Sequence, residues 1–146
     1  MPTKAENNKA TVVAFFKAIE AEKPKLISAL FADDGVHINP YHSGVFPEGA
    51  KGREAIHRYW EPTFPNFDGM KFPIHELHAM EGGNMVFVKY TGQIQLKDDA
   101  GVYENDYYST FKFNEAGEIT EYVEIFDPVK AAKGFGLLDQ LVAAQA

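Results

Sequence analysis

The sequence predicts an α+β protein in which three N-terminal helices cover the concave face of a cone-shaped, curved antiparallel sheet, followed by a C-terminal helix. Three observations support this fold class: apolar residues recur at helical spacing before residue 63, they alternate with polar residues after residue 72, and Gly-containing turns separate the alternating segments. A chain of 146 residues with no internal repeat or Pro/Gly/Ser-rich linker has the size of one domain. We therefore expect residues 1–146 to form a single domain.

The first part of the chain carries three helical patterns. An apolar stripe over residues 9–19 predicts the first helix, and Pro24 suits the first turn of the second. The second helix is expected to end at Asp33-Asp34-Gly35. A third helix is expected over residues 53–63, because its apolar side chains fall on one face.

The rest of the chain reads mainly as strands. Residues 36–39 alternate like a short strand, and residues 40–51 have the Pro and Gly content of a loop. An antiparallel meander of four strands is then expected over residues 72–80, 85–96, 102–114 and 118–127. A last helix is expected over residues 129–143, interrupted or shifted near Gly134 and Gly136.

Composition excludes several classes of function. The net charge of −7 argues against nucleic acid as a partner, because binding to phosphates needs a basic surface. No apolar run approaches the roughly 18 residues that span a bilayer, and residues 1–6 lack the pattern of a secretion signal, so we expect a cytoplasmic protein without a membrane partner. With no Cys and no zinc, nucleotide-binding or nucleophile-elbow motif, we expect no metal and no cofactor.

The order of elements, with ALFADD at residues 29–34, resembles the nuclear transport factor 2-like superfamily, which includes ketosteroid isomerases and SnoaL-type cyclases. Residues 52–54 (GRE), 121–128 (EYVEIFDP) and 135–137 (FGL) look most like the PhzA/PhzB branch of phenazine biosynthesis proteins. The resemblance covers nearly the whole chain and implies a homodimer or higher homo-oligomer. The superfamily reuses one cone for unrelated reactions, so function depends on the residues inside it.

The resemblance can be followed position by position. The three functional positions of the ketosteroid isomerases match Asn39, Phe15 and Ser109, which lack the isomerase side chains, so that mechanism is not expected here. The acid/base Glu of the PhzA/PhzB branch matches Glu124, whereas the partner His of that branch matches Tyr59. The resemblance therefore implies a retained acid/base carboxyl with a changed partner.

Strand alternation selects the candidate catalytic residues. If Asn39 points into the cone, His37 does so too, and Glu124 shares a face with Tyr122. A carboxyl among aromatic rings has a raised pKa, which suits Glu124 to general acid/base catalysis, with His37 as its partner and Tyr59 as a hydrogen-bond donor. The alternatives are a salt-bridged Glu, a core His bonded to a backbone carbonyl, and a Tyr that packs beside Trp60.

Further side chains are expected to contact the substrate from the helices, the strands and the loop at the mouth of the cone. These candidate substrate-binding residues are Phe15, Asn39, Tyr41, His42, Trp60, Phe64, Tyr107, Ser109, Phe111 and Tyr122. The many aromatic residues among them favour an aromatic or alicyclic substrate over a sugar or nucleotide.

Three functions remain open at this stage. The first is a cofactor-independent lyase, isomerase or cyclase that acts on a small hydrophobic ring compound, of which a lignin-derived diaryl compound is one candidate. The second is a PhzA/PhzB-like condensation in phenazine biosynthesis. The third is a non-catalytic ligand-binding or scaffold protein, for which Glu124 is expected to be salt-bridged and the cone to be filled by side chains.

Overall fold

Three neighbouring strands lie where the alternation predicts them, in a computed structural model that describes residues 1–146. They are β5 (Met85–Leu96), β6 (Val102–Phe113) and β7 (Ile119–Phe126), and each pairs antiparallel with the next. On β5 every second side chain enters the core, so that Val86, Val88 and Tyr90 are buried. Strands β5, β6 and β7 are three of the four strands of the predicted meander and form the centre of the sheet, and the fourth is β4 (Ile74–Ala79), which pairs antiparallel with β5.

The complete sheet has seven strands, because four further strands join this centre. These are β1 (Phe31–Ile38), β2 (Gly49–Lys51), β3 (Phe67–Lys71) and β4 (Ile74–Ala79). The strand order is β2-β1-β7-β6-β5-β3, and β4 also pairs with β5. Since β1 runs parallel to β7, the sheet is mixed rather than wholly antiparallel as expected.

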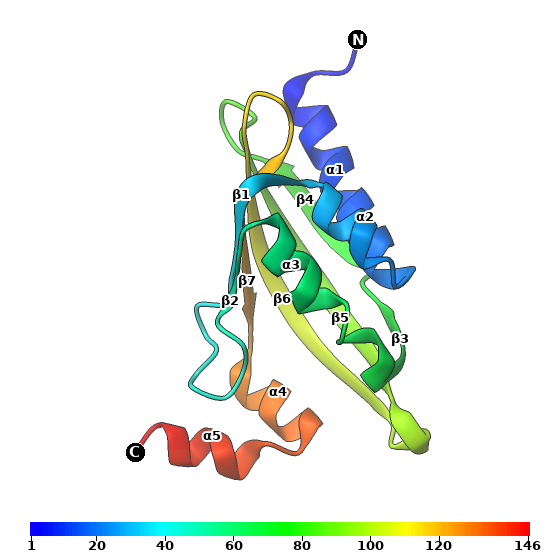
Figure 1. Ribbon diagram of the computed structural model, residues 1–146, viewed down its shortest axis with the longest axis vertical. Coiled ribbons are helices and arrows are strands. Elements are labelled where there is room, and N and C mark those ends of the chain that lie inside the picture. The colour runs from blue at the N-terminus through cyan, green and yellow to red at the C-terminus, as the bar shows by residue number, and fades with distance from the viewer.

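The helices determine which face of the curved sheet is covered. Helices α1 (Lys4–Glu20), α2 (Pro24–Ala29) and α3 (Arg53–Trp60) lie on one face, whereas α4 (Pro128–Phe135) and α5 (Leu138–Ala144) lie at one end of the sheet (Figure 1). The predicted interruption of the last helix is confirmed, since Gly136 and Leu137 separate α4 from α5. Two 3-10 helices, η1 (Phe64–Asn66) and η2 (Lys97–Asp99), complete the structure. None of the helices combines the length and apolarity required to cross a membrane.

Two helices end earlier than predicted, and two short strands, β2 and β3, were not predicted. Helix α2 ends at Ala29, because Phe31 instead begins β1, pairs with Ile119 and is fully buried. The register of β1 shifts before Val36, and the acidic pair that was expected to end the helix lies in this exposed, irregular part of the strand. Helix α3 ends at Trp60, and β3 was not predicted because its sequence FDGMK shows no strand alternation.

The opposite face of the sheet carries no helix (Figure 1). Phe87, Tyr108 and Ile125 have the opposite parity to the buried strand residues and are half-buried or exposed. Ile38 and Val123 are paired on the same face. We refer to these five residues as the convex-face patch.

Candidate acid/base site

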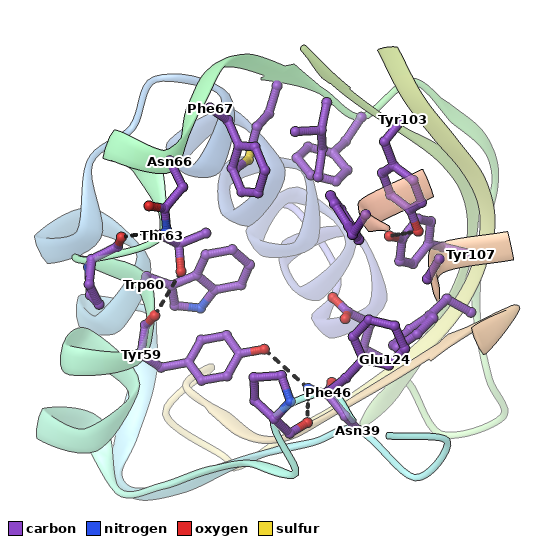
Figure 2. A pocket seen from close by; sticks show the side chains of 18 residues that line it. Asn39, Phe46, Tyr59, Trp60, Thr63, Asn66, Phe67, Tyr103, Tyr107 and Glu124 are labelled. Atoms are coloured by element: carbon purple, nitrogen blue, oxygen red, sulfur yellow. Dashed lines mark hydrogen bonds between the residues drawn. The ribbon is translucent and has the colours of Figure 1, made fainter. Parts of the chain in front are cut away.

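A cavity of about 420 Å³ lies between the concave face of the sheet and the surrounding helices. Its wall consists of 18 residues, 12 of them hydrophobic, which come from α3, η1, α4, the loop before β2 and strands of the sheet. Figure 2 shows Glu124 and Tyr107 on the sheet side of this space and Tyr59 and Trp60 on the helix side. The cavity is therefore an apolar container with few polar groups, which is typical of a small-molecule site.

Glu124 is the only carboxyl group in the cavity wall. It lies on β7 opposite Ser109 on β6, and its side chain has no cationic partner within 4.0 Å. The apolar surroundings raise the pKa of Glu124 to about 7, because burial disfavours the carboxylate more strongly than a hydrogen bond from Tyr122 favours it. Glu124 can therefore gain or lose a proton near neutral pH.

A chain of buried hydroxyl groups holds this carboxylate. Tyr122 Oη donates to Glu124 Oε2 over 2.7 Å, and Tyr90 Oη lies 3.2 Å from Tyr122 Oη. Because the proton of Tyr122 is used on Glu124, Tyr90 donates to Tyr122, and Ser109 Oγ donates to Tyr90 over 2.9 Å. Burial raises the pKa of both tyrosines well above the ordinary value, so they stay protonated as donors.

A second chain of hydrogen bonds runs from His37 to the cavity. Asn39 Nδ2 donates to the Pro47 carbonyl over 2.9 Å, which fixes the orientation of the amide and leaves Asn39 Oδ1 as an acceptor. His37 Nε2 donates to this oxygen over 2.9 Å, and Asn39 Nδ2 also donates to Tyr59 Oη over 3.1 Å. The Tyr59 proton has no protein acceptor, so Tyr59 is a donor available to a molecule in the cavity (Figure 2).

His37 stays neutral in this arrangement. It is 2% exposed and packs between the rings of Tyr59 and Tyr122, 4.7 and 4.6 Å away. Burial lowers the pKa of His37 to about 4, and its hydrogen bond to Asn39 opposes this only in part. His37 does not line the cavity, so its route to a bound molecule runs through Asn39 and Tyr59.

The predicted site residues divide into three groups. Asn39, Tyr59, Trp60, Tyr107 and Glu124 line the cavity. His37, Ser109 and Tyr122 lie behind this wall and reach it through the hydrogen bonds described above. The residues without a place at the cavity are Phe15, Phe111 and Phe64, which pack in the core, and Tyr41 and His42 on the loop.

The cavity wall also includes residues that the sequence analysis missed. Tyr103 shares the alternation of Tyr107 and Ser109 on β6, and this periodicity alone places it on the same face. Phe46 and Phe67 come from the loop before β2 and from the unpredicted β3, where no periodic pattern marks them. Phe135 reaches the cavity from α4.

No cationic side chain lines the cavity. Arg53 donates to the Phe31 carbonyl and pairs with Asp33 and Glu118, and Lys89 pairs with Glu76. No cluster of three or more His, Asp or Glu side chains is arranged to bind a metal ion. The electrostatic character of the cavity is therefore set by Glu124 and by neutral hydroxyl and amide groups.

The ionisation of Glu124 makes stability depend on pH. The folded-state pKa of Glu124 lies above the ordinary 4.5, so the folded protein favours the protonated form. The resulting contribution to the free energy of unfolding is fully present below pH 4.5 and is lost as pH rises through about 7. Relative to the wild type, Glu124→Gln is expected to gain on the order of 3 kcal/mol of unfolding free energy between pH 5 and pH 8. Urea denaturation of both proteins at both pH values measures this difference. The titration of His37 cancels because both proteins contain this residue. An equal difference at both would contradict the raised pKa.

Comparison with known proteins agrees with this fold. The model of the SnoaL-like domain family matches residues 12–122, which is most of the chain. The protein belongs to the SnoaL-like domain family. This family lies within the superfamily that the sequence resembles, and the predicted fold class is confirmed. No curated protein matches the sequence significantly.

Solved structures of SnoaL-like fold share the architecture at low sequence identity. A candidate isomerase from Bacillus subtilis has a TM-score of 0.83 at 18% identity, with 93% of this chain and 97% of that chain covered. A phenazine biosynthesis-related protein from Pseudomonas aeruginosa has a TM-score of 0.79 at 17% identity, with 92% of this chain and 83% of that chain covered. An LEH-like epoxide hydrolase from M. tuberculosis has a TM-score of 0.72 at 23% identity over 94% and 93%. The PhzA/PhzB branch is thus one of several structural neighbours.

Proposed function

We propose that this SnoaL-like protein is an enzyme that moves a proton on a neutral, ring-bearing small molecule, with Glu124 as general acid/base. The reaction class is that of a lyase, isomerase or cyclase, and it needs no cofactor because a protein carboxyl carries the proton. The observation that carries the proposal is an unpaired carboxyl with a pKa of about 7 in an apolar cavity. A general base is most effective when its pKa lies near the working pH.

The two hydrogen-bond chains give each group a separate task. The Glu124 carboxylate takes a proton from a carbon next to a substrate carbonyl, and the electron pair moves to the carbonyl oxygen. Tyr59 donates a hydrogen bond from its free O–H to that oxygen, while its own oxygen accepts a hydrogen bond from Asn39. Protonated Glu124 then returns the proton to another carbon or to a leaving group. His37 acts as a positioning residue that holds Asn39.

The absence of a cation from the cavity wall favours a neutral substrate. A carboxylate-bearing substrate would place a second negative charge near Glu124, in apolar surroundings and without a compensating partner. This argues against the condensation of carboxylated rings that the PhzA/PhzB resemblance implies, although Glu124 itself fits that reaction. The scaffold alternative required a filled cone and a salt-bridged Glu124, and the structure has neither.

A matched pair of ligands tests this assignment. We expect the neutral ketone 1-tetralone to raise the melting temperature of the wild type at pH 8, and its ring carboxylate analogue to have no effect. In Glu124→Gln the carboxylate analogue is expected to gain about tenfold or more in affinity, because the repelling charge is gone. Isothermal calorimetry on both proteins measures this change. Tighter binding of the carboxylate to the wild type would instead favour the phenazine-type reaction, and no binding of either would favour the scaffold.

The convex-face patch supports a homodimer. It crosses several adjacent strands, and no helix of the same chain covers it. Phe87→Lys is expected to shift the protein from dimer to monomer in light scattering after size exclusion. Leu26→Lys, an equally drastic change at an exposed site on α2, is expected to leave the mass unchanged. A monomeric wild type would contradict this assembly.

A further inference from the structure

Two tyrosines in the cavity wall have no task in the proposed reaction. Tyr103 and Tyr107 both come from β6, and their hydroxyl oxygens lie 2.9 Å apart. Figure 2 shows the pair on the sheet side of the cavity, whereas Tyr59 approaches from the helix side. The cavity therefore has two separate places at which it offers phenolic hydroxyl groups.

The neighbouring Asn105 determines how many protons the pair can offer. Asn105 Oδ1 accepts from the Asp106 backbone N–H, and Asn105 Nδ2 donates to the Asp127 carbonyl, which fixes the orientation of the amide. Asn105 Nδ2 also donates to Tyr103 Oη over 2.8 Å. One of the two phenolic protons forms the bond within the pair, and the other has no acceptor in the protein. The pair thus presents one free O–H donor to the cavity.

Two glycines leave room for these rings. A Cβ atom at Gly134 on α4 would lie 2.6 Å from Cδ1 of Tyr103, and one at Gly92 on β5 would lie 2.6 Å from Cε1 of Tyr107. Both distances are too short for non-bonded carbon atoms, so larger residues at either position would displace a tyrosine. Tyr103 also packs on Phe135, with ring centroids 4.3 Å apart. The rings are therefore held from several sides, as expected of a built subsite.

Burial keeps both hydroxyl groups protonated. It raises the pKa of Tyr103 and Tyr107, and the negative charge of Glu124 raises both pKa values further. The pair is consequently a neutral donor near neutral pH. A neutral O–H donor adds no positive charge, so in an apolar wall it matches a neutral oxygen better than it offsets the charge of a carboxylate.

We propose that Tyr103 and Tyr107 form a second subsite, which binds a hydroxyl or carbonyl oxygen of the substrate away from the reacting carbonyl. This inference rests on the proposed function, because it takes the same cavity as the substrate site. The substrate is then a neutral ring compound that carries at least two oxygen functions. One oxygen lies at Tyr59 beside the proton-transferring Glu124, and the other lies at the Tyr103–Tyr107 pair.

Binding of hydroxylated ketones tests the subsite without requiring turnover. The dissociation constants of 1-tetralone and its 5-, 6- and 7-hydroxy isomers are measured by isothermal calorimetry. We expect at least one isomer to bind the wild type about 3- to 10-fold more tightly than 1-tetralone, the usual gain from one neutral hydrogen bond. The double variant Tyr103→Phe/Tyr107→Phe is expected to lose this preference and to bind 1-tetralone like the wild type. Each single variant keeps one hydroxyl and is expected to lose only part of the preference, so the double variant is needed for the full loss.

Tyr108→Phe is the matched control, since Tyr108 lies next to Tyr107 on β6 but belongs to the convex-face patch. It is expected to keep the full preference. If the double variant does not fold, Tyr107→Phe alone should still reduce the preference at least twofold. Equal binding of all four ketones by the wild type, or an undiminished preference in the double variant, would overturn the subsite.

The same series separates this inference from the proposed function. In Glu124→Gln the preference for the hydroxylated ketone is expected to persist, because Glu124 makes no hydrogen bond to the pair. A preserved preference together with an unimpaired reaction in Glu124→Gln would contradict the proposed function alone. Failure of every ketone to bind the folded wild type would contradict both proposals.

Discussion

Replacement of Glu124 by Gln is expected to lower the rate of proton exchange on a bound neutral ketone by about 10²- to 10⁴-fold, the usual contribution of a general acid/base. The amide keeps the size of the side chain and an oxygen that can accept from Tyr122, but it cannot take up a proton. Proton NMR of 1-tetralone in deuterated buffer measures the exchange at the carbon beside the carbonyl. The affinity for 1-tetralone should change by less than about threefold, a free-energy change below 1 kcal/mol.

The pH profile adds a second test of this assignment. Because the pKa of Glu124 is raised to about 7, the carboxylate fraction and the wild-type exchange rate should rise with pH and level off above this value. The inflection should be absent in Glu124→Gln. Glu121→Gln is the matched control, since Glu121 lies on the same strand, pairs with Lys112 and does not line the cavity. An exchange rate reduced less than threefold in Glu124→Gln would exclude Glu124 as the base.

The geometry explains why alternation alone selected the right face of the sheet but not the residues that reach the cavity. Alternation determines the side of a strand on which a residue lies, and it says nothing of position along the cone. Phe111 and Tyr122 are paired on β6 and β7 and are sealed by Phe15, whose ring lies 5.1 and 4.8 Å from theirs. Farther along the strands, Tyr107 and Glu124 face the open part of the cone.

His37 also lies on the predicted side of its strand without reaching the cavity. Its parity with Asn39 was predicted, and both side chains are buried, His37 on β1 and Asn39 directly after its last residue. Asn39 contributes to the cavity wall, whereas His37 is enclosed by aromatic rings. The Asn39 amide connects His37 to the cavity, and its orientation is fixed by the Pro47 carbonyl in the loop before β2. No local sequence pattern contains this long-range contact.

The errors in the predicted secondary structure also come from contacts between residues that lie far apart in the sequence. Phe31 was placed in the helix that precedes it, since local spacing cannot reveal that Ile119, far along the chain, offers it a strand partner. The five residues of β3 carry Asp and Gly and acquire strand structure by pairing with the edge of β5. Tertiary contacts override weak local propensity in both cases. The long strands were predictable because their alternation extends over about 12 residues.

Substitution of Phe15 by Ala is expected to cost about 3–5 kcal/mol of unfolding free energy, the usual effect of removing a fully buried aromatic ring. The family resemblance aligns Phe15 with an isomerase position that contacts substrate. In this structure its ring packs against five other aromatic rings in the core, those of Phe16, Phe31, Trp60, Phe111 and Tyr122. Urea denaturation measures the loss, with Phe67→Ala as the matched aromatic control.

Phe15→Ala should mainly reduce stability and Phe67→Ala should mainly reduce ligand binding, because the two rings have different neighbours. Phe67 is half-buried, lines the cavity and has one aromatic ring neighbour, Phe135. Phe67→Ala should therefore cost less stability than Phe15→Ala and weaken ketone binding more. Without urea, and at a temperature at which the variant remains folded, Phe15→Ala should bind 1-tetralone like the wild type. Near-normal stability combined with weakened binding in Phe15→Ala would instead return Phe15 to the substrate-contacting wall, and with it the cavity geometry of the ketosteroid isomerases.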